Sequence, residues 1–128
     1  MNKDYRKWHQ VKTQIERQSQ MRGCQIREIW WCALGENVGV EIDGKNHLFQ
    51  RPVLIIRKFN QYMFLAVPLS TQLKTRDWYF RFKYKETFQT ALLSQIRLVS
   101  SKRLIRKVGR LDKKTFKMIK NLMIGLLK

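Results

Sequence analysis

Apolar positions recur with helical spacing near both ends of the chain. In residues 4–18 the apolar side chains stand three or four residues apart, at Tyr5, Trp8, Val11 and Ile15. Asp4 precedes them and is a residue type that commonly caps helices. Near the C-terminus, Asp112 precedes a lysine-rich segment whose apolar stripe consists of Phe116, Ile119, Leu122, Met123, Leu126 and Leu127. The pattern therefore predicts one helix at each end.

Between these helices, short apolar or alternating segments predict strands. The predicted strands span residues 25–34, 52–57, 62–69, 78–84, 91–99 and 105–111. A turn at 58–61 joins the second and third of them into a hairpin, and a short turn of helix is expected around 101–104. Several short strands closed by a terminal helix predict a small twisted β-barrel, in a mainly β (α+β) fold.

Residues 35–50 are predicted to form a long polar loop. A loop of this length is unusual in so small a domain and is usually functional. It contains three of the nine acidic residues of the chain, Glu36, Glu41 and Asp43. Neither these carboxylates nor the two histidines, His9 and His47, have the spacing of metal ligands. We therefore expect no metal and no cofactor.

Basic residues dominate the chain and are concentrated toward its C-terminus. The 128 residues include 27 Lys and Arg against 9 Asp and Glu, which gives a formal net charge of +18. Residues 97–128 hold 11 basic residues and 1 acidic residue, whereas residues 21–50 have a net charge of −1. Such a field attracts polyanions, with nucleic acid as the first candidate. A basic surface that serves only solubility, a membrane surface and an acidic protein partner are the alternatives.

The sequence excludes several other classes of protein. Hydrophobic residues make up 44% of the chain, which excludes disorder of the whole chain. The longest apolar run, Met63–Leu69, has 7 residues, against the ~20 that a membrane span needs. No apolar run of a secretory signal follows the charged first residues, so we expect a cytoplasmic location. Cys24 and Cys32 are expected to be buried, reduced thiols.

Arg51, Ser70 and Thr71 form the constellation that best indicates chemistry. Arg51 stands where the long loop enters a predicted strand, and Ser70 and Thr71 stand where the next strand ends. If the two strands pair as a hairpin, these positions meet at one rim of the sheet. A guanidinium and a hydroxyl at that rim are able to hold a phosphodiester through several oxygens. The alternative is a strand-end arginine beside a turn-forming Ser-Thr pair.

Five segments in the same order resemble the PemK/MazF toxins of type II toxin–antitoxin systems. They are Glu28–Trp31, Arg51–Ile55, Val67–Gln72, Leu93–Val99 and Lys102–Leu104. The resemblance covers residues 24–128, and residues 1–20 form an additional N-terminal amphipathic helix. It implies an SH3-like β-barrel with a C-terminal helix, a homodimer, and a cognate acidic antitoxin as partner.

The same resemblance implies an enzyme, a metal-independent and sequence-specific endoribonuclease (mRNA interferase) that cleaves single-stranded RNA. The 2′-OH would attack the phosphorus and leave a 2′,3′-cyclic phosphate and a 5′-OH. The catalytic arginine of the family falls on Arg51, and its catalytic hydroxyl falls on Ser70, with Thr71 as the alternative. Contacts to RNA are expected from Lys45, His47, Gln72, Lys74 and Arg76.

Two other functions are open at this point. A toxin that poisons DNA gyrase on a related barrel would bind a protein and cleave nothing, and a non-catalytic basic barrel would bind RNA or DNA. Neither needs Arg51 together with Ser70, so this pair favours the nuclease. The role of a row of aromatic residues is also open. These residues would either stack on RNA bases or pack in the core or an interface, and they are Trp78, Phe80, Phe82 and Tyr84. We expect packing.

Overall fold

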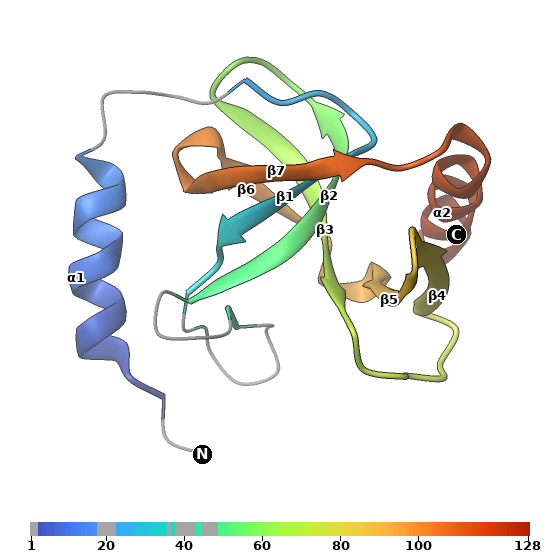
Figure 1. Ribbon diagram of the computed structural model, residues 1–128, viewed down its shortest axis with the longest axis horizontal. Coiled ribbons are helices and arrows are strands. Elements are labelled where there is room, and N and C mark those ends of the chain that lie inside the picture. The colour runs from blue at the N-terminus through green and yellow to red at the C-terminus, as the bar shows by residue number, and fades with distance from the viewer. Residues whose placement is uncertain (1–2, 18–22, 36, 38–42, 45–48) are drawn as a thin grey trace.

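The structure is a computed structural model, and it describes residues 3–17, 23–35, 37, 43–44 and 49–128. Its helices and strands are α1 (Tyr5–Glu16), β1 (Glu28–Ala33), β2 (Gln50–Lys58), β3 (Met63–Ser70), β4 (Tyr79–Tyr84), β5 (Thr87–Leu92), β6 (Arg97–Ser100), β7 (Leu104–Arg110) and α2 (Lys113–Leu126). Two short 3₁₀ turns flank β6, namely η1 (Leu93–Gln95) and η2 (Ser101–Arg103). The two helices lie on opposite sides of the strands (Figure 1).

Within the described residues, the strands form a seven-stranded antiparallel sheet that curls into a small barrel (Figure 1). Six of the strands are paired in the order β4-β5-β3-β2-β1-β7. The seventh, β6, pairs with β3 as well. Strands β2 and β3 form the predicted hairpin, from Val53 opposite Pro68 to Lys58 opposite Phe64. The predicted fold, a mainly β SH3-like barrel with a helix at each end, is confirmed.

Strand β2 is buried on both faces and separates two core clusters. Its Val53 and Ile55 face the barrel interior, together with Cys24, Trp30, Cys32, Leu34, Phe64, Ala66, Val99 and Leu104. Its Leu54 and Ile56 face the second cluster, which includes Phe116 and Ile119 of α2. Both cysteines are buried free thiols, as expected, and burial raises the pKa of Cys32 to about 12.

The predicted strand over residues 91–99 is wrong, because the chain makes two strands there. Strand β5 pairs with the end of β3 through Leu69 and Ser70, whereas β6 pairs with the beginning of β3, from Met63 to Ala66. The three residues of η1 are inserted between these two ladders, so one continuous strand does not satisfy both. The sequence pattern gives no sign of this interruption, because apolar residues stand on both sides of it.

The sequence pattern also gives no sign of the hairpin that joins β4 to β5. Its turn is formed by Lys85 and Glu86, which are not the glycine and asparagine residues that usually mark such turns. Lys85 nevertheless adopts a positive φ of 54°. The tertiary pairing of β4 with β5 therefore overrides the local preference of this residue.

The row of aromatic residues packs in the core, as expected, except for its first member. Phe80, Phe82 and Tyr84 pack with the cluster beneath α2, and the rings of Phe80 and Phe82 stack with centroids 6.2 Å apart. Trp78 precedes β4 and is 41% exposed. Of these four side chains, Trp78 is therefore the one whose exposure favours stacking on RNA bases.

Helix α1 docks onto the barrel through Trp8. Asp4 caps the helix by accepting a hydrogen bond from the backbone N–H of Lys7 at 3.0 Å. Trp8 is only 6% exposed, and its ring centroid lies 5.5 Å from that of Phe49. Gly35, with φ of 84°, permits this docking, because a Cβ there would come within 2.1 Å of the indole ring. The helix is thus seated on the segment that leads from β1 toward β2.

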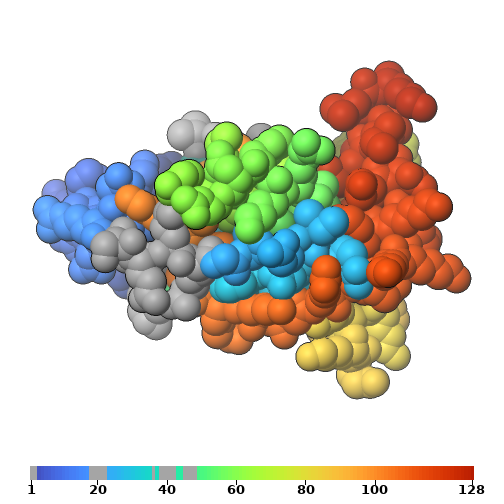
Figure 2. Space-filling view, turned by 90° about the horizontal axis from the view of Figure 1, so that it is seen from above, coloured from blue at the N-terminus to red at the C-terminus, as the bar shows by residue number. Residues whose placement is uncertain are grey.

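The apolar stripe of α2 is buried only in its first half. Asp112 caps the helix by accepting a hydrogen bond from the N–H of Thr115 at 2.9 Å. Phe116 and Ile119 are buried, whereas the later residues Leu122, Leu126 and Leu127 are exposed. Figure 2 shows the C-terminal segment projecting from the molecule at the end opposite α1.

Replacing Trp8 tests the docking of α1. We expect Trp8→Ala to lower the free energy of unfolding by about 3 kcal/mol, because it removes a large buried side chain and leaves a cavity over Gly35. Gln10→Ala, at an exposed position of the same helix, is the control and should change stability by less than about 0.5 kcal/mol. Urea denaturation measures both values. Equal effects of the two substitutions would contradict docking through Trp8.

Candidate active site

A cavity of about 220 Å³ lies where β2 begins and β3 ends. It is lined by Trp31, Gln50, Arg51, Pro52, Leu69, Ser70, Thr71 and Gln89. Arg51 therefore shares one cavity with Ser70 and Thr71, as the hairpin geometry predicts. Apolar walls with a few polar groups are typical of a ligand-binding site.

Arg51 is a buried cation held by backbone carbonyl groups. It is 5% exposed, its Nε donates to the carbonyl of Asp43 at 2.9 Å, and its Nη1 donates to the carbonyl of Leu69 at 3.1 Å. Burial lowers the pKa of Arg51 from its ordinary value, and the Asp43 carboxylate partly offsets this. A guanidinium removed from water in this way attracts an anion more strongly than an exposed one.

The bond from Arg51 to Leu69 joins the arginine to the residue before Ser70. In the ladder between β2 and β3, Val53 lies opposite Pro68. Continuing this register by two residues toward the end of β3 brings Arg51 opposite Ser70. Two independent constraints, a ladder and a side-chain hydrogen bond, thus place the guanidinium beside the end of β3. The site is built on strands rather than on flexible loops, which favours fixed geometry.

Ser70 is more enclosed than Thr71. Its side chain is buried, and its Oγ accepts a hydrogen bond from the backbone N–H of Gln72 at 3.2 Å, whereas Thr71 is exposed. Thr90, opposite Ser70 in β5, donates its hydroxyl to the carbonyl of Gln72 at 2.7 Å. Both backbone polar groups of Gln72, its N–H and its carbonyl, are therefore held by hydroxyl groups, and these bonds fix the turn that leaves β3. Both hydroxyls line the cavity, and Ser70 is the one with a fixed orientation.

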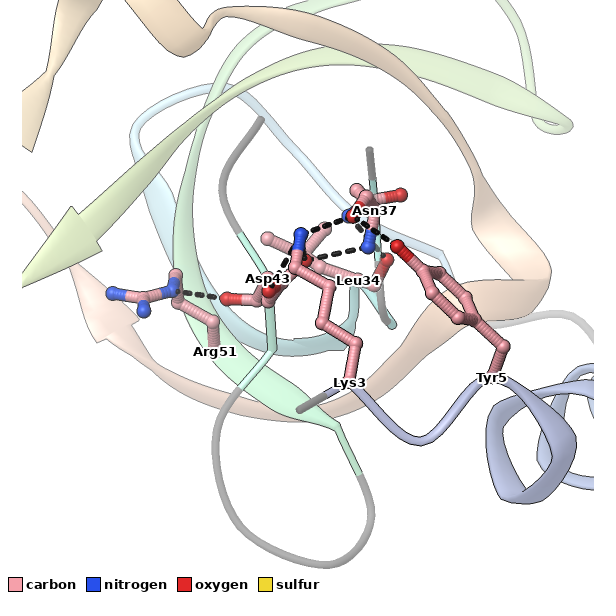
Figure 3. A network of polar contacts seen from close by, with 6 residues as sticks. All are labelled: Lys3, Tyr5, Leu34, Asn37, Asp43 and Arg51. Atoms are coloured by element: carbon pink, nitrogen blue, oxygen red, sulfur yellow. Dashed lines mark hydrogen bonds and ion pairs between the residues drawn. The ribbon is translucent and has the colours of Figure 1, made fainter. Parts of the chain in front are cut away.

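A network of polar contacts links the N-terminus to Arg51 (Figure 3). Lys3 forms an ion pair with Asp43 at 3.2 Å and donates to the carbonyl of Asn37, and the hydroxyl of Tyr5 donates to the same carbonyl at 3.2 Å. The backbone N–H of Asn37 donates to the carboxylate of Asp43, whose own carbonyl accepts from Arg51. The segment before α1 therefore contacts the residue that orients the guanidinium.

Three of the residues expected to contact RNA do not line the cavity. Gln72, Lys74 and Arg76 lie on the connection from β3 to β4, which leaves the cavity at Thr71. Lys74 lies over the ring of Tyr79, with its Nζ 5.5 Å from the centroid. Lys45 and His47 lie outside the described residues.

The described part of the chain contains no group of three or more His, Cys, Asp or Glu side chains placed to hold a metal ion. Of the loop carboxylates, Asp43 is described and is paired with Lys3, while Glu36 and Glu41 lie outside the described residues. None of the helices in these same residues is long and apolar enough to cross a membrane.

Sequence reasoning missed five residues that line the cavity, Trp31, Gln50, Pro52, Leu69 and Gln89. Trp31 and Gln50 belong to the adjacent strands β1 and β2, and only the pairing of these strands brings their side chains to one rim. Gln89 lies in β5, a strand that the apolar pattern did not place. The one available signal for Gln89 is its polar character two residues before the buried Ala91, and this signal has meaning only once β5 is known.

The fold and this cavity define a small, basic β-barrel with an arginine and a hydroxyl at one rim. A family model described as "PemK-like, MazF-like toxin of type II toxin-antitoxin system" matches residues 25–127. The chain belongs to this family, as the resemblance indicated. Helix α1 lies outside the matched residues.

The chain is also similar to a solved structure described as an endoribonuclease in complex with its cognate antitoxin from a mycobacterial species. The TM-score is 0.62 and the sequence identity 14%, with 82% of this chain and 95% of that chain covered. A likeness at this identity shows the shared fold. A comparison with curated proteins gives no match.

Proposed function

We propose that this chain is a toxin that cleaves single-stranded RNA at specific sequences. The observation that carries the proposal is the buried guanidinium of Arg51 in one cavity with the hydroxyls of Ser70 and Thr71. Its membership of a toxin family and its likeness to an endoribonuclease support the proposal. The net charge of +18 supports a polyanionic substrate.

In the proposed reaction, the ribose 2′-OH attacks the adjacent phosphorus and the bond from phosphorus to the 5′-oxygen breaks. The 2′-OH loses its proton, the leaving oxygen gains one, and the products are a 2′,3′-cyclic phosphate and a 5′-OH. Arg51 stabilises the negative charge that develops on the phosphorane oxygens, which suits a group with a pKa ordinarily above ~12. The hydroxyl of Ser70, or that of Thr71, positions the phosphate.

The connection from β3 to β4 is proposed to carry the RNA away from the cavity. Gln72, Lys74 and Arg76 follow Thr71 directly along the chain, and Lys74 and Arg76 bring positive charge to a strand of phosphates. Lys45 and His47, which precede Arg51 in the long loop, are also proposed to contact the RNA.

A homodimer is proposed as the active form. The exposed half of α2 and the segment around Trp78 border an apolar hollow of about 360 Å³, lined by Trp78, Leu93, Ser94, Ile96, Met123, Leu126 and Leu127. Exposed apolar surface of this kind is typical of a protein–protein contact.

The direct test of the proposed function is RNA cleavage by the purified chain in the presence of EDTA. We expect cleavage to survive the chelator, because the 2′-OH is the nucleophile and Arg51 supplies the positive charge. Sequencing of the product ends should show 5′-OH termini. Intact RNA would favour a gyrase-binding toxin or a non-catalytic nucleic-acid-binding barrel, and 5′-phosphate ends would contradict the proposed chemistry.

Substitutions at the cavity separate the roles of its side chains. We expect Arg51→Ala to lower the cleavage rate by about 10²–10³-fold, because it removes the donor to the developing charge. Ser70→Ala should lower the rate by less. Arg57→Ala is the control, since Arg57 is an exposed arginine of the same strand. If Ser70→Ala is fully active and Thr71→Ala is inactive, Thr71 supplies the hydroxyl.

A cognate acidic antitoxin is proposed to occupy the RNA site. Its carboxylates would replace phosphates opposite the basic surface, and a partly disordered chain is able to fold over a large area. We expect the antitoxin encoded beside this toxin to compete with RNA, so that RNA affinity falls as antitoxin concentration rises. Titration of labelled, uncleavable RNA measures this. Simultaneous binding without mutual effect would exclude inhibition by occupation of the site.

A further inference from the structure

Gln89 lines the cavity and carries a buried polar atom that has no partner. In the register of β4 and β5 it lies opposite the buried Phe82, two residues before the buried Ala91. Among the side chains that the structure describes, Gln89 Oε1 is the buried oxygen or nitrogen for which no hydrogen-bond partner is present. Buried polar groups are almost always paired, so an unpaired acceptor in a cavity wall points to a ligand that donates to it.

The unpaired Oε1 of Gln89 lowers the stability of the free protein. A buried carbonyl oxygen without a partner destabilises the fold, whereas an apolar side chain of similar size would not. The neighbours of Gln89 across and along the sheet, Phe82 and Ala91, are apolar and do not supply a donor from their side chains. A residue that breaks a packing rule at a cavity is typical of a functional position.

The cavity has room for one planar ring system beside Gln89. A water molecule occupies about 30 Å³ in the liquid, so 220 Å³ corresponds to about seven waters. Trp31, Pro52 and Leu69 give the cavity apolar walls, while Arg51 and Ser70 give it a polar part. Gln89 is part of the same lining, and the terminal torsion of glutamine is soft, so its amide is able to rotate toward a ligand.

We propose that Gln89 determines sequence specificity by accepting a hydrogen bond from an N–H group on the edge of an RNA base. The base is that of a nucleotide next to the phosphate held by Arg51, and the inference rests on the RNA cleavage proposed above. Side-chain amides read base edges well, because their acceptor and donors lie in one plane. A base that presents an acceptor at this edge is rejected, since two acceptors then face each other.

The test compares the base preferences of two variants on an RNA pool of random sequence. Gln89→Leu removes the acceptor and keeps most of the side-chain volume. The matched control is Gln61→Leu, at an exposed position in the turn between β2 and β3. Sequencing of the cleaved ends gives the preference for each base at each position around the cut.

We expect Gln89→Leu to weaken the preference at one position by about 10-fold and to leave the others unchanged. Gln61→Leu should retain every preference of the wild-type chain. The thermal unfolding midpoint of Gln89→Leu should equal or exceed that of the wild type, because the variant buries no unpaired oxygen.

Two results would overturn this role of Gln89. A uniform fall in cleavage with unchanged preferences would indicate a contact to ribose or phosphate, which carry no base identity. A lowered thermal midpoint with unchanged preferences would indicate a purely structural residue. Failure of the proposed function looks different, because the wild-type chain would then leave the RNA pool uncut, and no reaction would exist for Gln89 to direct.

Discussion

The antiparallel ladder between β2 and β3 is the constraint on which the rest of the molecule depends. Strand β2 contributes side chains to both core clusters, and β3 is paired on its other edge by β5 and β6 in succession. The same ladder brings the beginning of β2 beside the end of β3, where Arg51 and Ser70 meet. A shift of register by one residue would exchange the side chains that β2 gives to the two clusters and separate Arg51 from Ser70, so the core and the site are fixed together.

Arg51 illustrates how the fold holds a charge that it does not neutralise directly. Among the described residues, its hydrogen bonds go to the carbonyls of Asp43 and Leu69 rather than to a carboxylate. Carbonyl groups orient a guanidinium without cancelling its charge, which leaves the cation available to an incoming phosphate. Gln89 also lines this cavity, and its buried oxygen has no hydrogen-bond partner in the free protein.

Helix α1 is a feature of this chain outside the part that matches the family. Trp8 seats the helix over Gly35 and Phe49, and Lys3 pairs with Asp43 ahead of the helix. The N-terminal part of the chain therefore contacts Gly35, Asp43 and Phe49, and Asp43 in turn accepts a hydrogen bond from Arg51.

Apolar spacing, charge and capping residues determined much of this protein from the sequence alone. They placed both helices with their caps at Asp4 and Asp112, the β2–β3 hairpin, and the meeting of Arg51 and Ser70 at one cavity, because each depends on contacts close along the chain or across one short turn. The break between β5 and β6, the hairpin turn at Lys85, and the position of Gln89 were decided only by tertiary structure. For the break and for Gln89, the cause is the pairing of β5 and β6 with β3, which lies distant in sequence and leaves no periodic trace in the residues themselves. For Lys85, the cause is the pairing of β4 with β5, which overrides the local preference of the residue.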